Sequence, residues 1–405
     1  MYSVAICRYA LFFAVPVVLF LVEVVAAIAL PRRKVEEFKD NSVRQRIAVL
    51  VPAHDEGSGL LPTLADSKAQ LRIADRLIVV ADNCTDDTAS VAAAAGAEVV
   101  ERNDAARRGK GYALACGLDY LRADRPDIVI VIDADCRLGE QAIDRLARAC
   151  VETHGPVQAL DLMISPSGSS LNFKVAEFAW RVKNQLRPLG LKALGLPCQL
   201  MGTGMAFPWE VIASVDLGSQ AIVEDLKLGL ELAQLGHAPT FCPSAAVTSV
   251  FPSCAAAGRS QRLRWEQGHI GLILMAAPRL ILAALARGNG RLLALALDLA
   301  IPPLSLLATL VIVTAVIAGL AEVIGFSPAA TTIAAGSLAA LFAGVFLSWL
   351  KVGRDILPLR SILLVAPYLI GKIPMYGLML SGRAASQWTR TERGKPERKE
   401  TTTIL

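Results

Sequence analysis

Acidic residues stand at the ends of short apolar runs in the first third of the chain. The runs 46–52, 76–81 and 127–133 lead into Asp55 and Glu56, into Asp82, and into the pair Asp133 and Asp135. Carboxylates at one place repel one another unless a cation or a hydrogen-bonding ligand offsets the repulsion. Oxygen ligands with few His or Cys neighbours suit Mg²⁺ or Mn²⁺, and such an ion neutralises a diphosphate leaving group. We therefore predict a Mg²⁺ or Mn²⁺ site at Asp133 and Asp135, although any one of these acids alone is better explained by capping or solvation.

The elements that position these acids follow from the alternation of apolar runs with helical patterns. Strands are expected at 46–52, 76–81, 97–101 and 127–133, and helices at 60–70, 86–95 and 111–122. Unbroken apolar strands that alternate with helices indicate a parallel sheet with helices on both faces. Such sheets bind ligands at the carboxyl ends of their strands, where helix N-termini also point. The sequence therefore predicts an α/β domain that brings the acids to one edge.

Hydrophobic segments flank this domain on both sides. Of the 405 residues, 54% are hydrophobic and 19% are charged, whereas a soluble domain carries about a quarter charged residues. Residues 299–321 and 323–350 contain no charge, and residues 9–30 contain only Glu23. Each stretch reaches the roughly 20 residues that span a bilayer as a helix. We predict a transmembrane helix in 1–30, a retained anchor rather than a cleaved signal, with Glu23 facing a partner helix rather than lipid.

The remaining boundaries follow from the same pattern. We expect a catalytic domain in 31–260, an interfacial helix in 261–290, a C-terminal transmembrane region in 291–382 and a basic tail in 383–405. The segment 361–382 contains Lys372 between two prolines, and it could either span the bilayer or lie in the interface.

Charge and cysteine content restrict location and partners. Basic residues follow the first and third apolar stretches, at Arg32, Arg33 and Lys34, and at Lys351, Arg354 and Arg360. Positive loops tend to stay cytoplasmic, so we expect an integral protein of a bacterial inner membrane with a cytoplasmic catalytic domain. No basic patch interleaved with aromatic residues occurs in the sequence, which argues against nucleic acid as a partner. The eight cysteines form no CxxC pair and are expected to be reduced.

The motifs around the acids resemble those of inverting family 2 glycosyltransferases, which have the GT-A fold. Residues 133–135 look like the DxD motif of that family, and residues 51–56, 80–88 and 108–113 resemble its first-strand, second-strand and Gly-Lys-Gly motifs. Ala81 departs from the pattern, where an Asp is common. The resemblance implies that Asp82 binds the nucleobase, helped by the loop around Glu56, and that Lys110 lies near the nucleotide. The donor-binding residues expected from it are Pro52, Ala53, Glu56, Asp82, Lys110 and Asp133.

Two later motifs resemble the membrane-integrated branch of the same family, which includes cellulose, hyaluronan and chitin synthases and ceramide glucosyltransferase-like enzymes. Glu224-Asp225 is similar to the ED motif, and residues 261–265 are similar to the Q(Q/R)xRW motif. The resemblance implies that Asp225 is the catalytic base for the acceptor hydroxyl. The residues expected at the acceptor or the diphosphate are Glu224, Gln261, Arg262, Arg264, Trp265 and Gly204. The plainer alternative for Asp225 is an acid that stabilises a helix N-terminus. The plainer alternative for the second motif is a basic, aromatic helix at the membrane interface, continued by an apolar helix over 270–285.

We therefore expect a membrane-bound hexosyltransferase. Its partners would be a nucleotide-sugar donor, a lipid-linked or glycan acceptor of cell-envelope or exopolysaccharide synthesis, and membrane lipids. The resemblance implies a UDP-linked donor first and a GDP-linked donor second. A processive polysaccharide synthase is the alternative with the same chemistry, and product length separates the two. An inactive membrane scaffold is the alternative of another class, which the Ala81 departure allows and the retained motifs oppose. A nucleotidyltransferase leaves the acceptor-side motifs without a purpose.

Overall fold

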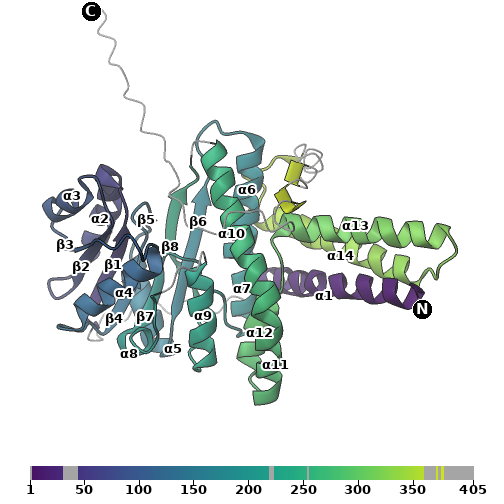
Figure 1. Cartoon of the computed structure of the whole chain (residues 1–405), viewed down its shortest axis with the longest axis horizontal. Coiled ribbons are helices and arrows are strands. Elements are labelled where there is room, and N and C mark those ends of the chain that lie inside the picture. Colours follow the sequence, from purple (N-terminus) through teal and green to yellow (C-terminus); the bar gives the residue numbers. More distant parts are fainter. Residues whose placement is uncertain are drawn as a thin grey trace, which may run out of the picture.

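The computed structural model describes residues 2–30, 44–218, 223–252, 255–359, 371–372 and 375–377. Within them an eight-stranded sheet, in the order β3-β2-β1-β4-β7-β6-β8-β5, forms the centre of an α/β domain (Figure 1). The strands are β1 Ile47–Ala53, β2 Arg76–Asp82, β3 Glu98–Arg102, β4 Ile128–Val131, β5 Arg137–Leu138, β6 Val157–Ile164, β7 Met205–Pro208 and β8 Thr240–Val250.

The strands pair in a mixed but mostly parallel sheet. The first four, in the spatial order β3-β2-β1-β4, are parallel, and they match the four strands predicted from the sequence. β7 runs antiparallel to both β4 and β6, β6 and β8 are parallel, and β5 pairs antiparallel with β8. Since the carboxyl ends of β1, β2 and β4 lie at one edge, the acids that follow these strands meet there. The predicted α/β fold with a mostly parallel sheet is confirmed.

Both faces of the sheet are buried, which explains why its central strands are apolar throughout. In β1, Val49 and Val51 pack into one core, and Ala48 and Leu50 pack into the other. The helices of the first face are α2 Leu61–Lys68, preceded by the 3₁₀ turn Gly57–Leu60, α3 Thr88–Ala94 and α5 Ala142–Thr153. The helices of the second face are α4 Lys110–Leu121, α8 Trp209–Ile212 and α9 Glu224–Gln234.

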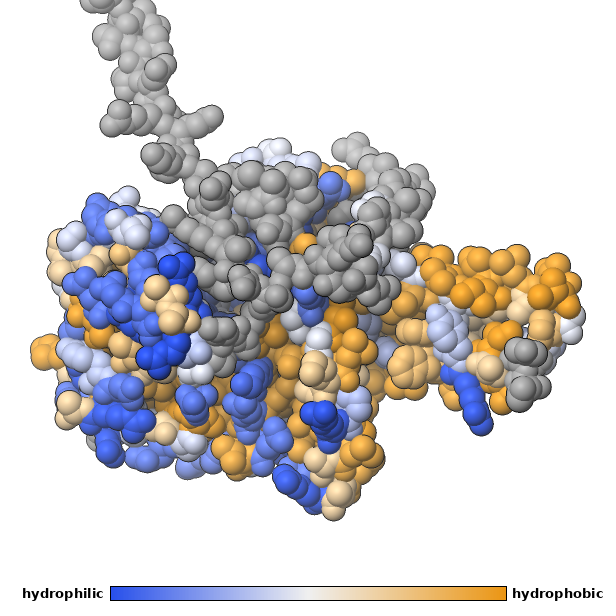
Figure 2. Space-filling model, in the orientation of Figure 1, coloured by the Kyte–Doolittle hydropathy of each residue, from blue (hydrophilic) through white to orange (hydrophobic). Residues whose placement is uncertain are grey.

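Three long helices form an arm that extends away from the α/β domain (Figure 1). They are α1 Tyr2–Ala29, α13 Leu304–Val323 and α14 Ala329–Val352, and among the described residues these three are long and apolar enough to cross a membrane. The surface of the arm is largely hydrophobic (Figure 2). Phe12 on α1 is 70% exposed and Phe342 on α14 is 68% exposed, which suits contact with lipid rather than water.

A layer of helices connects the sheet with the arm. It consists of α6 Leu171–Arg181, the π-helical turn Val182–Leu186, α7 Arg187–Ala193, α10 Ala255–Met275, α11 Ala277–Arg287 and α12 Gly290–Leu299. The helix predicted to continue over 270–285 is present but divided, because α10 ends at Met275 and α11 leaves it at an angle of 44°. Pro278 explains the break, since proline cannot donate the backbone hydrogen bond that a continuous helix needs.

The first helix of the arm is fixed to this layer by a buried ion network. Arg187 Nε donates to Glu23 Oε2 at 2.6 Å, and the same guanidinium pairs with the carboxylate of Asp298. Gln199 Nε2 donates to the second oxygen of Asp298 at 2.7 Å. A Cβ on Gly190 would stand 1.9 Å from the backbone oxygen of Glu23, so only glycine permits this approach of α7 to α1. Glu23 therefore faces partner helices rather than lipid, as its place in an apolar stretch predicted.

Three predicted segments fall outside the described residues. They are the basic stretch after the first span, the tail 383–405 and most of 361–382. Of the last segment, Lys372 is described, and its ammonium pairs with Glu266 Oε1 of α10 at 2.5 Å and donates to Ser305 Oγ at 3.0 Å.

Candidate active site

The loop after β1 is held against the loop after β2 by backbone and hydroxyl contacts. His54 Nδ1 lies 2.6 Å from the backbone oxygen of Asp82. The backbone N–H groups of Glu56 and Gly57 both donate to Thr88 Oγ1 at 2.8 Å. Asp55 has a positive φ of 50°, a conformation that asparagine and aspartate tolerate better than most residues. These contacts fix the two loops that were predicted to hold the donor.

Asp82, predicted to bind the nucleobase, is nearly buried at the end of β2. Its Oδ1 accepts from Arg102 Nη1 at 2.6 Å and from Asn83 Nδ2 at 2.9 Å. Arg102 ends the neighbouring strand β3, so the pair joins two strand ends at the ligand-binding edge. A contact between Asp82 and a nucleobase stays a prediction.

Lys110 connects the end of β4 with the glycine turn before β7. It begins α4, its ammonium pairs with Asp133 Oδ1, and it donates to the backbone oxygen of Gly202 at 2.7 Å. Burial lowers the pKa of Lys110, but Asp133, Glu224 and Asp225 outweigh this effect and raise the pKa above its ordinary value. The ammonium is therefore charged, and it attracts the carboxylates of Asp133, Glu224 and Asp225.

Glu224 and Asp225 begin α9 and face the same ammonium. Burial raises the pKa of Glu224 to about 7, with a further contribution from Asp225, while Lys110 lowers it. Burial also raises the pKa of Asp225, and Lys110 and Lys183 lower it. A carboxyl with a raised pKa is a stronger proton acceptor, which is the property that a catalytic base needs.

The glycine turn before β7 divides into two parts. Gly202 has φ +97°, and a Cβ there would lie 3.5 Å from Asp225 Oδ2. Gly204, predicted to contact the acceptor, has φ +64° and packs against the side chains of Ala159 and Val247 in the sheet. The glycine of this turn that reaches the cavity described below is thus Gly202, and Gly204 lets the turn pack onto the sheet.

A cavity of about 740 Å³ joins these groups to the arm of α1, α13 and α14. Nine residues predicted from the sequence line it: Glu56, Lys110, Asp133, Glu224, Asp225, Gln261, Arg262, Arg264 and Trp265. Five predicted residues are not part of its lining: Pro52, Ala53, Asp82, Asp135 and Gly204. The opposite wall consists of apolar side chains of α1, α13 and α14, among them Phe20, Leu307 and Phe346. One space therefore extends from the carboxylates to side chains of the arm.

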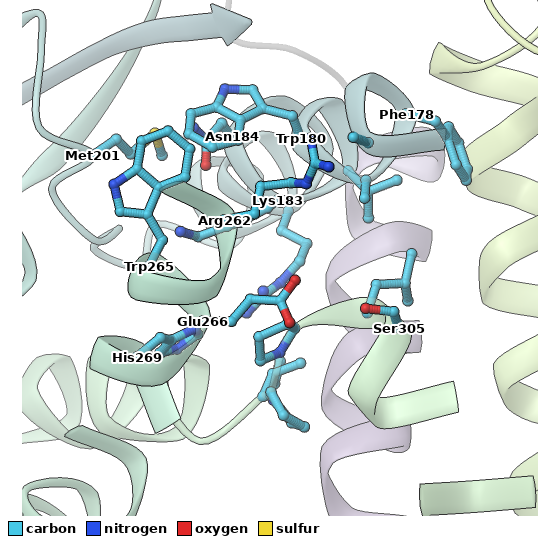
Figure 3. A pocket seen from close by; sticks show the side chains of 18 of the residues that line it. Phe178, Trp180, Lys183, Asn184, Met201, Arg262, Trp265, Glu266, His269 and Ser305 are labelled. Carbon is cyan, nitrogen blue, oxygen red and sulfur yellow. The ribbon is translucent and has the colours of Figure 1, made fainter. Parts of the chain in front are cut away.

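Aromatic residues form the upper wall of the cavity in Figure 3. The rings of Trp265 on α10 and Trp180 on α6 lie 5.2 Å apart. The guanidinium of Arg262 stands over the ring of Phe173 at 5.9 Å, within the range of a cation–π contact. The helix with the Gln-Arg-Leu-Arg-Trp motif is thus packed on α6, and it presents its polar side chains to the cavity.

The donor set at the end of β4 fits a divalent ion. Asp133 and Asp135 supply hard oxygen ligands one residue apart, and the side chain of Asp133 is 35% exposed to the cavity. Mg²⁺ typically takes one or two carboxylates and completes its shell with substrate phosphates and water. Within the described ranges, the one group of three close acidic or thiol ligands is Asp55, Cys84 and Asp86, which lies on the neighbouring loops. Metal binding by Asp133 and Asp135 stays a prediction.

Sequence reasoning missed the contribution of α6 and α7 to the site. Lys183 and Asn184, in the π-helical turn, line the cavity, as does Arg187. The sequence feature that could have indicated this contribution is a cluster of polar residues before Arg187-Pro188 in a helical pattern. A solvated helix face explains such a cluster equally well. The apolar wall from α1, α13 and α14 gives no signal of its own, because spanning helices are apolar in any case.

The family follows from the comparison of residues 44–268, which match the model described as glycosyltransferase like family 2. This match covers more than half of the chain, and the chain belongs to that family. The probable glycosyltransferase YdaM of Bacillus subtilis is 25% identical over 264 residues, which is 60% of each chain. A glucosyl-3-phosphoglycerate synthase of Mycolicibacterium paratuberculosis is 38% identical over 112 residues, or 26% of this chain and 33% of the relative. The matches thus span between a third and 60% of these curated relatives.

A solved structure agrees with this assignment at the level of the fold. The mannosyltransferase PcManGT from Pyrobaculum calidifontis, in complex with GDP-mannose and Mn²⁺, superposes with a TM-score of 0.51. The superposition covers 86% of this chain and 97% of that chain at 17% sequence identity. The sheet and its helices therefore have the GT-A fold.

Proposed function

We propose that this chain is a membrane-bound, inverting glycosyltransferase that transfers one sugar from a nucleotide-sugar to a lipid-linked acceptor of the cell envelope. Among the nucleotide-sugars, a UDP-linked donor is preferred to a GDP-linked donor. The observation that carries the proposal is the single cavity with Asp133 and Asp225 at one end and side chains of α1, α13 and α14 at the other. A lipid acceptor needs such a path, since its chains stay in the bilayer while its headgroup reaches the polar end. The catalytic domain would then lie on the cytoplasmic side of a bacterial inner membrane.

The proposed chemistry assigns a role to each polar group. The acceptor hydroxyl attacks the anomeric carbon, the bond from that carbon to the diphosphate oxygen breaks, and the hydroxyl proton passes to the carboxylate of Asp225. Lys110 and Arg264 offset the negative charge that develops on the diphosphate. Trp265 offers an apolar face on which the transferred sugar stacks.

A divalent ion completes the proposed site. Asp133 and Asp135 would hold Mg²⁺ or Mn²⁺, and the ion would supply positive charge for the diphosphate. The ammonium of Lys110 pairs with Asp133 Oδ1. This ion pair orients the carboxylate of Asp133, which lines the cavity.

Transfer of one sugar is preferred to processive synthesis. Among the described residues, three helices are long and apolar enough to span a membrane, or four if the bent pair of α10 and α11 is one span. The apolar wall of the cavity suits a lipid better than a growing, hydrated polysaccharide. An inactive scaffold would have no reason to keep Lys110, Asp133 and Asp225 around one point.

Donor screening tests this function. The full chain in nanodiscs is incubated with UDP- and GDP-sugars, with Mg²⁺ or Mn²⁺, and with or without bacterial lipid extract, and nucleoside diphosphate release is measured. We expect release that depends on the metal and is stimulated by lipid, and a lipid product one sugar heavier by mass spectrometry. Release that lipid extract does not change refutes the lipid acceptor, and a long polymer refutes single transfer.

A pair of variants on one helix tests the base. Asp225→Asn should lower kcat by about 10²–10⁴, the usual contribution of a positioned base, and leave nucleotide affinity near the wild-type value. Glu231→Gln on the same helix, whose side chain is 38% exposed, should behave like wild type. Unchanged turnover in Asp225→Asn excludes it as the base.

A further inference from the structure

A rare helical turn projects two polar side chains into the cavity. The π-helical turn Val182–Leu186 lies between α6 and α7, and such turns are frequent at functional sites. Lys183 and Asn184 belong to this turn and line the cavity with Trp180 and Arg262 (Figure 3). Arg187, directly after the turn, is fixed by Glu23 and Asp298. Arg187 therefore fixes the C-terminal end of the turn, while the two polar side chains of the turn face the cavity.

Among the described residues, the ammonium of Lys183 has an aromatic neighbour but no counter-ion within 4.0 Å. It lies 5.9 Å from the centre of the Trp180 ring. Over the part of the chain that the structure describes, no carboxylate oxygen comes within 4.0 Å of it. Burial lowers the pKa of Lys183, and the more distant Asp225 and Asp161 oppose this only in part. A partly buried cation without a counter-ion costs free energy, which an anionic ligand at this point would recover.

Asn184, the next residue after Lys183, also has a polar atom without a partner in the described structure. Its side chain is 1% exposed, and its Nδ2 donates to Asp161 Oδ2 at 2.9 Å. Its Oδ1 is buried and has no hydrogen-bond partner in the described structure. Buried polar atoms are rarely left unpaired, so this oxygen is suited to accept a hydrogen bond from a ligand.

Two other cations around the cavity are held in ion pairs. Lys110 pairs with Asp133, and Lys372 pairs with Glu266. Lys183, and Arg262 over the ring of Phe173, have no such ion pair among the described residues, so both are available to an incoming anion. The place of Lys183, close enough to Asp225 to influence that carboxyl, is on the acceptor side of the proposed reaction.

We propose that Lys183 and Asn184 recognise an acceptor whose attacking hydroxyl belongs to a phosphate-bearing headgroup. The ammonium of Lys183 binds the phosphate, Asn184 Oδ1 accepts from a headgroup hydroxyl, and the attacking hydroxyl lies at Asp225. The inference rests on the proposed transfer to a lipid-linked acceptor and names the chemical class of that acceptor. Lys183 is thus a specificity-determining residue.

Binding of defined short-chain lipids to the full chain in detergent tests this assignment. The probes are dioctanoyl phosphatidylglycerol, dioctanoyl phosphatidylethanol, which keeps the phosphodiester and lacks the headgroup hydroxyls, and uncharged dioctanoylglycerol, each titrated by calorimetry. We expect phosphatidylglycerol to bind about tenfold or more tightly than dioctanoylglycerol, as a charge-assisted hydrogen bond provides. Phosphatidylethanol should fall between them, because it satisfies Lys183 and not Asn184.

Variants at Lys183 complete the test. Lys183→Gln should lose about tenfold in affinity for phosphatidylglycerol and none for dioctanoylglycerol, while Lys183→Arg keeps the preference. Lys174→Gln, at an exposed position of α6, is the matched control, and nucleoside diphosphate affinity reports on the fold of every variant. Wild-type affinity of Lys183→Gln for phosphatidylglycerol overturns the phosphate contact, and equal binding of phosphatidylethanol and phosphatidylglycerol overturns the role of Asn184.

A soluble probe separates this inference from the proposed function. If sn-glycerol 3-phosphate binds as tightly as phosphatidylglycerol and Lys183→Gln weakens both, the phosphate site is supported and the lipid nature of the acceptor is refuted. If lipid extract stimulates transfer but Lys183→Gln binds phosphatidylglycerol like wild type, the proposed function stands and the phosphate contact falls.

Discussion

Replacement of Arg187 by methionine tests how strongly the first span is fixed to the catalytic domain. The guanidinium pairs with Glu23 of α1 and Asp298 of α12, and the three side chains are 8%, 6% and 6% exposed. Methionine fills a similar volume but leaves the carboxylates of Glu23 and Asp298 buried without a cation. The variant should be less stable, and α1 should separate from the catalytic domain first during unfolding.

The magnitude follows from the burial of the network. Removal of one partner of a buried ion pair costs roughly 3–5 kcal/mol, mainly because a charge stays behind uncompensated. At roughly 2–4 °C per kcal/mol for a domain of about 200 residues, the unfolding temperature should fall by about 6–20 °C. Arg122→Met is the matched control, because Arg122 pairs with Asp119 and the two side chains are 56% and 71% exposed. Exposed pairs contribute about 0–1 kcal/mol, so the control should lose less than about 4 °C.

The assay is thermal unfolding of the purified chain in detergent, followed by intrinsic fluorescence. A double-mutant cycle with Glu23→Gln isolates the pair, and the two single losses should exceed the loss of the double variant by more than about 1 kcal/mol. If Arg187→Met unfolds like Arg122→Met, or if the changes at Arg187 and Glu23 add within about 0.5 kcal/mol, the network does not hold α1 to the domain.

Three further predictions concern the site and its supports. Since burial raises the pKa of Asp225, kcat/KM should fall as pH drops and this base becomes protonated. Burial raises the pKa of Glu224 to about 7, so the stability that protonated Glu224 contributes should be lost as pH rises through about 7, visible as a falling unfolding temperature. Gly190→Ala should lower the unfolding temperature by an amount equivalent to about 1–3 kcal/mol or more, whereas Gly319→Ala, where a Cβ meets open space, should not. Lys110→Met should abolish turnover and weaken nucleotide binding in calorimetry, and wild-type affinity would exclude contact with the diphosphate.

The fold was predictable where burial on two faces leaves a clear trace in the sequence. The strands β1, β2 and β4 are apolar on both sides, so their runs are continuous and their ends are marked by acids. The short strands β5 and β7, with two and four residues, carry no such signal. Their antiparallel pairing depends on contacts between segments far apart in the chain.

The polar half of the site was predictable on two grounds. Asp133 follows a buried strand, so sheet geometry places it at the edge where the carboxyl ends of the strands meet. Asp225 was predicted from the resemblance of Glu224-Asp225 to the ED motif. The membrane half was not predictable, because its wall combines residues near position 20, position 180 and position 340, which only the tertiary fold brings together. Glu23 was the exception, since one carboxylate in an apolar span requires a partner, and the structure supplies Arg187.

The contact of Gly190 with the backbone of α1 has a consequence for the lipid environment. Because α7 rests directly on α1, the catalytic domain cannot rise or sink independently of the first span. If α1 spans a bilayer as proposed, the distance between Asp225 and the headgroups would be set by the position of α1 in that bilayer. A helix responds to a thicker or thinner hydrocarbon core by changing its tilt. Acyl-chain length in the surrounding membrane would then be a determinant of catalytic rate, independent of the chemistry of the substrates.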